Sequence, residues 1–471
     1  MAHSVPDMLI RNAEIWQHGR ADVRIAAGNI AAIGELQAVE GEDVIDARGG
    51  ALLPGLHDHH LHLAALAVAR ASVRCGPPEV NDAAALTYAL SLPGENWLRG
   101  IGYHESVAGM LDAATLDRLA PDRPVRIQHR SGRMWFFNSI ALAQLLERAP
   151  PPPGLEREGS RWTGRLFDED RWLRDTLAGA PPTFAEISAE LAAMGVTGLT
   201  DMSPGNDVNM AAHFAGEQVS GALRQCVVLA GSLALADARF DAALWLGPAK
   251  LHLHEAALPD LEETVSFMRA AHAQARSVAI HCTTETELVF ALAALESAGS
   301  IAGDRIEHAG VAPDHLVAEI ARMGLHVVSQ PHFIAERGDQ YLRDVDARDQ
   351  PFLYRLAAFQ RAGIVLAAGS DAPFGSCDPW AAMRAAVSRR TTSGAVIGSD
   401  EALPPEGALA LFLADPLRLE RERRIETGAP ADLCLLDRPW SEARTRLQSG
   451  DVRLTLVGGS IAHNRVDQAP V

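Results

Sequence analysis

Four histidines and an aspartate lie close together in residues 54–63, which read PGLHDHHLHL. Successive side chains of a β-strand point to opposite faces, so Asp58, His60 and His62 would share one wholly polar face. The other face carries the remaining two histidines together with leucines, which favours packing against neighbouring elements. Because imidazole is a favoured ligand of zinc, His60 and His62 are interpreted as a pair of metal ligands. For an isolated His-x-His pair, a surface cluster or hydrogen-bonded core histidines would be the alternative.

Ionisable side chains also stand at the ends of several later apolar segments. His281 ends SVAIH, His308 ends RIEH and Asp371 ends VLAAGSD, while Lys250 opens KLHLHE. A buried lysine or aspartate at the end of an apolar strand is costly unless it is paired or bound to a metal. This recurrence predicts that the side chains converge on one polar site.

The elements that would position these residues alternate between strands and helices. Short runs rich in Val, Ile and Leu recur through residues 195–373, and helical stretches such as 258–272 separate most of them. Repeated βα units predict a parallel sheet. Together with the histidine-rich segment the runs number eight, as in a (β/α)8 TIM barrel, where functional side chains lie at the carboxyl ends of the strands.

The two ends of the chain differ from this middle part. Both read as short strands with Gly and Asn turns, which predicts a small β-sandwich domain composed of residues 1–52 and 415–471. The barrel would then cover residues 53–414. Residues 64–185 show little regular alternation and are expected to form a long insertion after the first barrel strand, as a subdomain at the rim.

The bulk composition is that of a globular protein, with 48% hydrophobic and 22% charged residues. No apolar run approaches about 20 residues, so no membrane span is expected, and the start of the chain lacks the pattern of a signal peptide. Five scattered cysteines suit a reducing compartment. The net charge of −18 argues against nucleic acid or an anionic membrane as a partner. We therefore expect a cytoplasmic protein that acts on a small molecule, and a homo-oligomer stays open.

The motif PGLHDHHLH followed in order by Lys250, His281, His308 and GSDAP resembles the amidohydrolase superfamily of metal-dependent hydrolases. The resemblance covers nearly the whole chain and includes GAPADLCLLD, where the chain would return to the β-domain. The insertion, with RMWFFNSIAL and TGRLFDED, resembles the branch that includes N-substituted formamide deformylases.

This resemblance implies a binuclear centre, with zinc as the default metal. The family's ligand positions are filled here by His60, His62, Lys250, His281, His308 and Asp371. The first two histidines and the aspartate would bind one metal, the other two histidines would bind the second, and the lysine, carboxylated by CO2, would bridge them. A metal-bound hydroxide would attack an amide or related C–N bond. Asp371 would act as general base and then acid, and Asp58 would orient a metal-bound imidazole from outside.

Further side chains are candidates for substrate contact. Arg133 stands in SGRMWFFNS where many relatives are expected to have histidine. A guanidinium pairs well with a carboxylate, so Arg133 suggests an anionic group on the substrate, with an internal ion pair as the alternative. His252 and His254 share strand parity with Lys250, although His254 is expected to point into solvent. The remaining candidates are His332 and Trp135, and for Trp135 a place in the hydrophobic core is the alternative.

Two other functions stay open. A deaminase of a ring amidine would use a single metal with Lys250 unmodified, but the glutamate that such deaminases place three residues after the position of His281 is Thr284 here. A non-catalytic homologue that has lost its metals would lack ligands, whereas all the ligand positions are filled. The number of metals and the choice among zinc, manganese, iron and cobalt also stay open.

Overall fold

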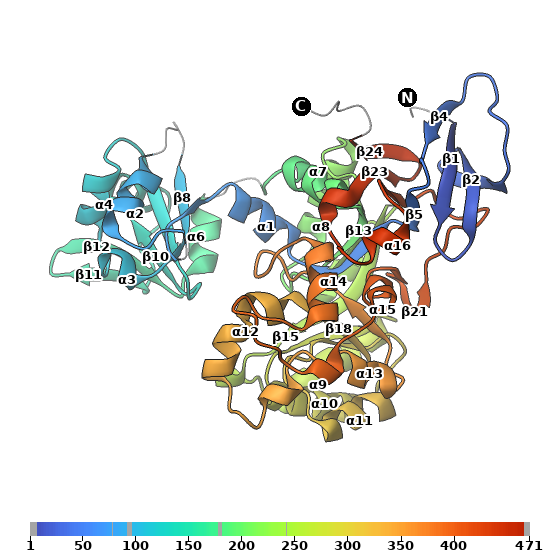
Figure 1. Ribbon diagram of the computed structural model, residues 1–471. Coiled ribbons are helices and arrows are strands. Elements are labelled where there is room, and N and C mark those ends of the chain that lie inside the picture. Colours follow the sequence, from blue (N-terminus) through green and yellow to red (C-terminus); the bar gives the residue numbers. More distant parts are fainter. Residues whose placement is uncertain (1–6, 78, 92–96, 178–180, 242, 466–471) are drawn as a thin grey trace. The chain divides into compact units, whose positions relative to one another are not determined.

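The computed structural model describes residues 7–77, 79–91, 97–177, 181–241 and 243–465 (Figure 1). The chain divides into two compact units, one formed by Met1–Leu63 with Thr183–Val471 and the other by Ala64–Pro182. Each unit has its own sheets and its own hydrophobic core. They are therefore described separately.

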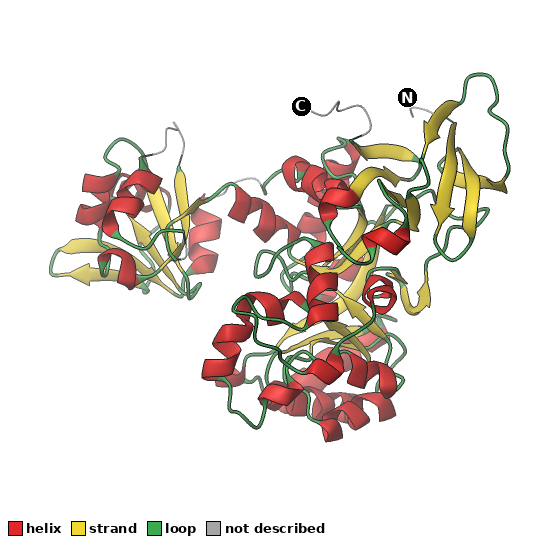
Figure 2. Ribbon diagram, in the orientation of Figure 1, coloured by secondary structure: helices red, strands yellow, loops and turns green. Residues whose placement is uncertain are grey.

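Eight parallel strands form a barrel in the first unit, with the helices placed around the strands (Figure 2). In chain order the strands are β6 (Leu56–Leu61), β13 (Val196–Asp201), β14 (Cys226–Gly231), β15 (Leu244–His252), β16 (Val278–Cys282), β17 (Arg305–His308), β18 (His326–Ser329) and β19 (Leu366–Ala368). The last strand lies next to the first, and the N–H of Asp371 donates to the carbonyl of His60 at 2.6 Å. The predicted (β/α)8 TIM barrel is confirmed.

Helices of the barrel begin where the sequence offers caps. The side chain of Asp260 accepts the N–H groups of Glu262 and Glu263 at the start of one helix, and Thr284 forms a capping box with Glu287 at the start of the next. The principal helices of this unit are α7 (Ala185–Ala193), α8 (Val208–Val219), α9 (Leu261–Ala273), α10 (Glu285–Ala298), α11 (Asp314–Arg322), α12 (His332–Asp344), α13 (Ala357–Arg361), α14 (Pro379–Ser388), α15 (Pro405–Ala410) and α16 (Trp440–Ala443).

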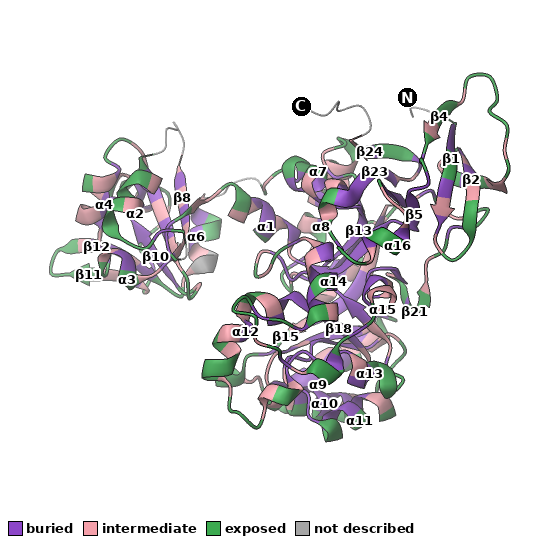
Figure 3. Ribbon diagram, viewed as in Figure 1, coloured by how far each residue is buried: buried purple, intermediate pink, exposed green. Residues whose placement is uncertain are grey.

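Alternation along the strands decides which side chains face the helices. In β16, Val278, Ile280 and Cys282 belong to the apolar cluster that also contains residues of α9, α10 and α11. The intervening residues, Ala279 and His281, therefore point to the interior of the barrel. Figure 3 shows the barrel strands as buried, while the outer faces of the helices are exposed. The interior is consequently where polar residues at the strand ends meet.

Both ends of the chain contribute to a second sheet, as predicted. Its strands lie in the order β24-β23-β22-β5-β1-β2-β3, with β4 paired to β1. In this sheet β5 is parallel to β1 and antiparallel to β22. The bounds are β1 (Met8–Ile15), β2 (Gly19–Ala26), β3 (Asn29–Gly34), β4 (Asp43–Asp46), β5 (Ala51–Pro54), β22 (Leu433–Leu436), β23 (Val452–Val457) and β24 (Ser460–Asn464). A separate hairpin, β20 (Ala414–Asp415) with β21 (Arg418–Glu422), precedes the returning strands.

The second unit is more regular than its sequence suggests. It contains a sheet in the order β11-β12-β10-β9-β8-β7. The strands are β7 (Val73–Arg74), β8 (Leu98–Tyr103), β9 (Val125–His129), β10 (Met134–Phe137), β11 (Leu155–Glu158) and β12 (Arg161–Phe167). The helices are α1 (Leu63–Arg70), α2 (Ala83–Leu90), α3 (Glu105–Ala108), α4 (Ala113–Leu119), α5 (Ser139–Arg148) and α6 (Asp170–Leu177). Every residue of β10 is buried, so the strand reads as a continuous apolar run and its period of two is hidden.

Within the described parts of the chain, no helix is both long and apolar enough to cross a membrane.

Candidate metal centre

Two histidines and an aspartate meet where the first and last barrel strands end. His60 lies in β6 and His62 follows that strand, while Asp371 follows β19. The Oδ1 atom of Asp371 is 3.1 Å from Nε2 of His62 and 3.4 Å from Nε2 of His60. The first strand and the loop after the last strand thus bring together three of the predicted ligands.

Two more of the predicted ligands adjoin this group from β16 and β17. Nε2 of His308 lies 2.9 Å from Nδ1 of His281, and the ring centroids of His308 and His60 are 4.8 Å apart. His60, His308 and Asp371 each offer a ligand atom, and these atoms all lie within 4.8 Å of one another. The carboxyl ends of four strands therefore converge on one point.

Lys250 is the sixth predicted ligand, and its side chain is buried in the interior-facing row of β15. Its Nζ atom has no hydrogen-bond partner among the residues that the structure describes. Burial lowers the pKa of Lys250 to about 8, so that the neutral amine is much more accessible than in an exposed lysine. A buried amine without a partner is expensive, and a bound group at this position would relieve the cost.

Hydrogen bonds fix three of the imidazoles by their Nδ1 atoms. The Nδ1 atom of His60 is 2.5 Å from Oε2 of Glu307, that of His62 is 3.1 Å from Oγ of Ser203, and that of His308 is 2.7 Å from Oε1 of Gln330. When Nδ1–H donates to such a partner, the lone pair of a neutral imidazole is on Nε2. In all three rings Nε2 is the atom that faces the cluster. This donor set fits a divalent metal.

The electrostatics of the cluster favour the neutral form of two of its imidazoles and the charged form of its carboxylate, whereas the pKa of His60 is raised, because the contacts with Glu307 and Asp371 outweigh burial and the nearby Lys250. Burial lowers the pKa of His308 to about 3, and burial together with the neighbouring His308 lowers the pKa of His281. Burial alone would raise the pKa of Asp371, but the adjoining rings of His60 and His62 hold it well below its usual range. Neutral imidazole and ionised carboxylate are the forms that bind metals.

The backbone is strained at two of the predicted ligands. His308 has a φ of 70° and Asp371 a φ of 51°, a left-handed region that residues other than glycine seldom adopt. Such strain persists only where the surrounding structure enforces it, and it is concentrated at functional sites. At the adjoining Gly369, a Cβ atom would lie 2.3 Å from the backbone nitrogen of His60, so only glycine allows this close approach.

Asp58 supports the cluster in a different way from the one expected. Its Oδ1 atom accepts the backbone N–H of His60 and that of Ser370, both at 3.0 Å, and it contacts no imidazole through a hydrogen bond that the described residues show. It therefore joins β6 to the loop that carries Asp371. Outside the predicted ligands, a carboxylate that contacts a ligand imidazole is that of Glu307, which lies against His60.

The predicted substrate-contacting residues of the first unit lie in three different settings. His252 ends β15 with an exposed side chain, and its ring stacks on that of His281 with centroids 4.2 Å apart. His254 is exposed and accepts the N–H of Ala256 through its side chain. His332 is buried at the start of α12, and its Nε2 donates to the carbonyl of Ser370 at 2.9 Å.

The other two predicted substrate residues belong to the second unit. Arg133 donates from Nε and Nη2 to the two carboxylate oxygens of Asp168, each at 2.7 Å, which is the internal ion pair considered as the alternative. Trp135 is 4% exposed and belongs to a hydrophobic core with Phe137 and Leu166, which is likewise the alternative to substrate contact.

Glu307, Gln330 and Ser203 were missed by sequence reasoning. One signal was available, because a glutamate inside a completely buried strand such as β17 requires a partner. The glutamine and the serine follow apolar strands, where polar residues are common, so their types alone gave no signal. The remaining two histidines of residues 54–63, His57 and His59, are buried, and Nε2 of His57 lies 2.9 Å from Oγ1 of Thr200.

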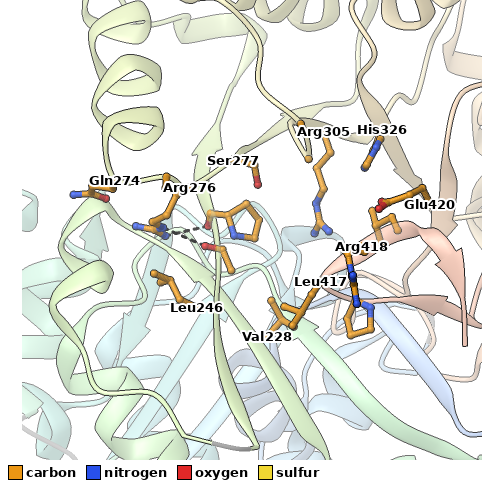
Figure 4. Close-up of a pocket in the computed structure, with 17 residues that line it drawn as sticks. Val228, Leu246, Gln274, Arg276, Ser277, Arg305, His326, Leu417, Arg418 and Glu420 are labelled. Atoms are coloured by element: carbon orange, nitrogen blue, oxygen red, sulfur yellow. Dashed lines mark hydrogen bonds between the residues drawn. The ribbon is translucent and has the colours of Figure 1, made fainter. Parts of the chain in front are cut away.

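A cavity of about 390 Å³ lies at the opposite, amino ends of the barrel strands (Figure 4). It is lined by residues within β14 and β15, by residues that precede or begin β16 to β18, and by the β20–β21 hairpin. Arg276, which contributes to its wall, donates to the backbone oxygens of Gly247, Pro248 and Ser232. Arg305 also lines the cavity, and its Nε atom donates to Glu307. Arg305 and Glu307 thus lie between the cavity and the predicted ligand His60.

Comparisons with known proteins agree with this geometry. The sequence profile of the amidohydrolase family matches residues 43–463. The N-substituted formamide deformylase of Arthrobacter pascens is 25% identical, over 94% of this chain and 95% of its own length. An uncharacterized metal-dependent hydrolase from Pyrococcus horikoshii has a TM-score of 0.79 at 20% identity, over 95% of this chain and 100% of that one. A second, from Pyrococcus furiosus, has a TM-score of 0.75 at 21% identity, over 92% and 99%. At these identities the two solved structures show a common fold.

Proposed function

The chain belongs to the amidohydrolase family and is a metal-dependent hydrolase, and we propose that the bond it cleaves is an amide or related C–N bond of a small molecule. The observation that carries this proposal is the convergence of the Asp371 carboxylate with imidazoles whose Nε2 atoms face it. A carboxylate of this kind can move a proton between a water molecule and the leaving nitrogen. An amine is a poor leaving group until it is protonated, so this proton is needed for C–N cleavage.

Two divalent ions, with zinc as the default, are proposed to bind at the cluster. His60, His62 and Asp371 would hold one, and His281 and His308 would hold the other. Lys250, carboxylated at Nζ by CO2, is proposed to lie between the two; its buried, unpartnered amine among the described residues supports this role. When bound, such ions supply Lewis-acid chemistry, in that they acidify a water molecule and polarise the scissile carbonyl.

Side chains of the protein are proposed to transfer the proton, orient the metal ligands and contact the substrate. Asp371 is proposed to accept a proton from the attacking water on its carboxylate and to return this proton to the leaving nitrogen. Glu307, Ser203 and Gln330 hold three imidazoles in one tautomer, so that the site is organised before the substrate arrives. His252, which stacks on His281 from the neighbouring strand β15, is proposed to contact the substrate.

The named relative supports a substrate class. N-substituted formamides are the substrates that its name gives, and we propose small N-substituted amides and formamides as the first class to examine here. A ring deaminase is less consistent with the structure. The position where it would need a proton-donating glutamate is Thr284, whose side chain accepts the N–H of Glu287 to cap α10.

The test compares D371N with wild-type protein on a panel of N-substituted formamides and amides, using preparations of determined metal content. If Asp371 transfers the proton, kcat/KM falls by about 10²–10⁴-fold at equal metal content. The control is D304N, because Asp304 is also buried but lies at the amino end of β17, where it accepts the N–H of Val278. The proposal fails if the metal-loaded wild type hydrolyses none of the panel, or if D371N is as active as D304N.

A further inference from the structure

Glu307 lies between the predicted metal ligands and the amino ends of the barrel strands, where it contacts both His60 and Arg305. It immediately precedes His308 in β17 and is completely buried. Its Oε2 atom is 2.5 Å from Nδ1 of His60, and its Oε1 atom accepts from Nε of Arg305 at 2.6 Å. Both carboxylate oxygens are therefore engaged by nitrogen donors.

Arg305 is itself fixed in place. Its side chain is 4% exposed, and Nη2 donates to the carbonyl of His59 at 3.3 Å and lies 3.0 Å from Sδ of Met202. The guanidinium is planar and cannot become an acceptor, so its Nε–H holds the orientation of the Glu307 carboxylate. Three buried side chains thus form a chain of contacts, from Arg305 through Glu307 to His60.

We propose that Glu307 is a positioning residue for His60 as a metal ligand, and that Arg305 acts on His60 through Glu307. Because Oε2 accepts the Nδ1 proton, the ring presents the lone pair of Nε2 to the cluster and cannot rotate without breaking a short hydrogen bond. This inference rests on the proposed metal site, but it does not depend on which bond the enzyme cleaves.

Substitution of Glu307 by glutamine tests this role with little change in side-chain shape. It has nearly the shape of glutamate but only one acceptor oxygen, whereas the site holds two donors, from His60 and from Arg305. In E307Q one of these donors must face the amide NH2 group. Loss of such a partner of a metal-bound histidine typically lowers metal affinity by about 10–100-fold.

A matched control exists elsewhere in the barrel unit. Glu401 is also buried and also accepts from an arginine, Nε of Arg355, at 3.0 Å. Its Oε2 atom accepts the backbone N–H groups of Leu356 and Ala358, and Nη2 of Arg361 lies 3.6 Å from Oε1. E401Q therefore removes the same charge from a similar environment without touching a predicted ligand. A general loss of stability would affect both variants.

The experiment measures the affinity of the full-length, metal-free protein for Zn²⁺ by competition with a chromogenic chelator. It also records the visible absorption of the Co²⁺-loaded protein, which reports the ligand field. We expect E307Q to bind Zn²⁺ about 10–100-fold more weakly and to shift the Co²⁺ absorption, with both properties unchanged in E401Q. Wild-type affinity and absorption in E307Q, or equal losses of affinity in both variants, would overturn the proposal.

Two further variants keep the test decisive. E307D retains the charge and both acceptors but is one methylene shorter, and it replaces E307Q in the experiment if E307Q does not fold. Wild-type affinity and Co²⁺ absorption in E307D would likewise refute the role of Glu307.

R305K tests whether Arg305 acts on His60 through Glu307. If Arg305 acts only through Glu307, the double variant R305K/E307Q binds Zn²⁺ no more weakly than E307Q alone, whereas additive losses would assign Arg305 a separate effect. Because metal binding is measured directly, an absence of amide hydrolysis would leave this result intact.

Discussion

Replacing Glu287 by glutamine is expected to loosen two loops that border the candidate metal centre. Glu287 is a buried residue in the first turn of α10. Its Oε2 atom accepts the N–H of Thr283 at 2.7 Å, the hydroxyl of Thr283 at 2.9 Å and the N–H of Thr284 at 3.2 Å. Its Oε1 atom accepts the N–H of Glu255 at 2.9 Å. One carboxylate therefore joins the loop after His281 to the loop after β15.

The expected cost follows from these four hydrogen bonds. The single amide oxygen of E287Q can replace Oε2 and keep three of the donors, but the NH2 group then faces the N–H of Glu255. A hydrogen bond to a charged group contributes about 1.5–3 kcal/mol, and the three that remain would be made to a neutral acceptor. We therefore expect the free energy of unfolding to fall by about 3 kcal/mol.

The assay is urea unfolding followed by circular dichroism at a fixed free zinc concentration. The control is E285Q, because Glu285 lies in the same first turn of α10 and makes no hydrogen bond through its side chain to the described residues. Its charge near the helix N-terminus contributes only about 0.3–1 kcal/mol. If E287Q is as stable as E285Q, the account of Glu287 as the residue that joins these loops is wrong.

The remaining predictions concern residues whose roles the structure distinguishes. K250A is expected to lower the number of bound metals per chain, and added short carboxylic acids should restore part of it, measured by plasma mass spectrometry; unchanged metal content would refute a ligand role for Lys250. W135A should destabilise the protein by about 3–5 kcal/mol, measured by urea unfolding, because it removes a buried aromatic side chain, and a normal stability with a raised KM would instead indicate substrate contact. R133A and D168N should change KM equally little if the two residues pair only with each other, whereas a selective loss of affinity for anionic substrates in R133A would contradict the ion-pair interpretation.

The barrel and the two-ended sheet were accessible from the sequence because they depend on local patterns. The strands of the barrel are buried on both faces and read as short apolar runs between capped helices. The strands at the two ends of the chain are short and are separated by turns that contain Gly and Asn. The sheet of the second unit was not accessible. Its strand β10 lies between two hydrophobic clusters, with Phe136 in one and Trp135 and Phe137 in the other, so no alternation marks it.

His60 and His62 could be proposed from strand parity, and the other candidate ligands from their places at the ends of apolar runs together with the family resemblance. The partners of these ligands could not be proposed in this way. Glu307 bonds to His60 across 247 positions of sequence, and Asp58 to Ser370 across 312. Parity also fails at β17, because adjacent residues should point to opposite faces while Glu307 and His308 both reach the cluster. The positive φ of His308 explains this exception, since a left-handed residue turns its side chain out of the regular alternation.

The most direct test of a metal-dependent site is the metal content of protein purified without a chelator or a histidine tag. About two metal ions per chain, measured by plasma mass spectrometry, would agree with a centre held by four histidines, Asp371 and a carboxylated Lys250. About one ion per chain would favour a mononuclear site with the lysine unmodified. No bound metal, with none regained on incubation with zinc and bicarbonate, would contradict the account.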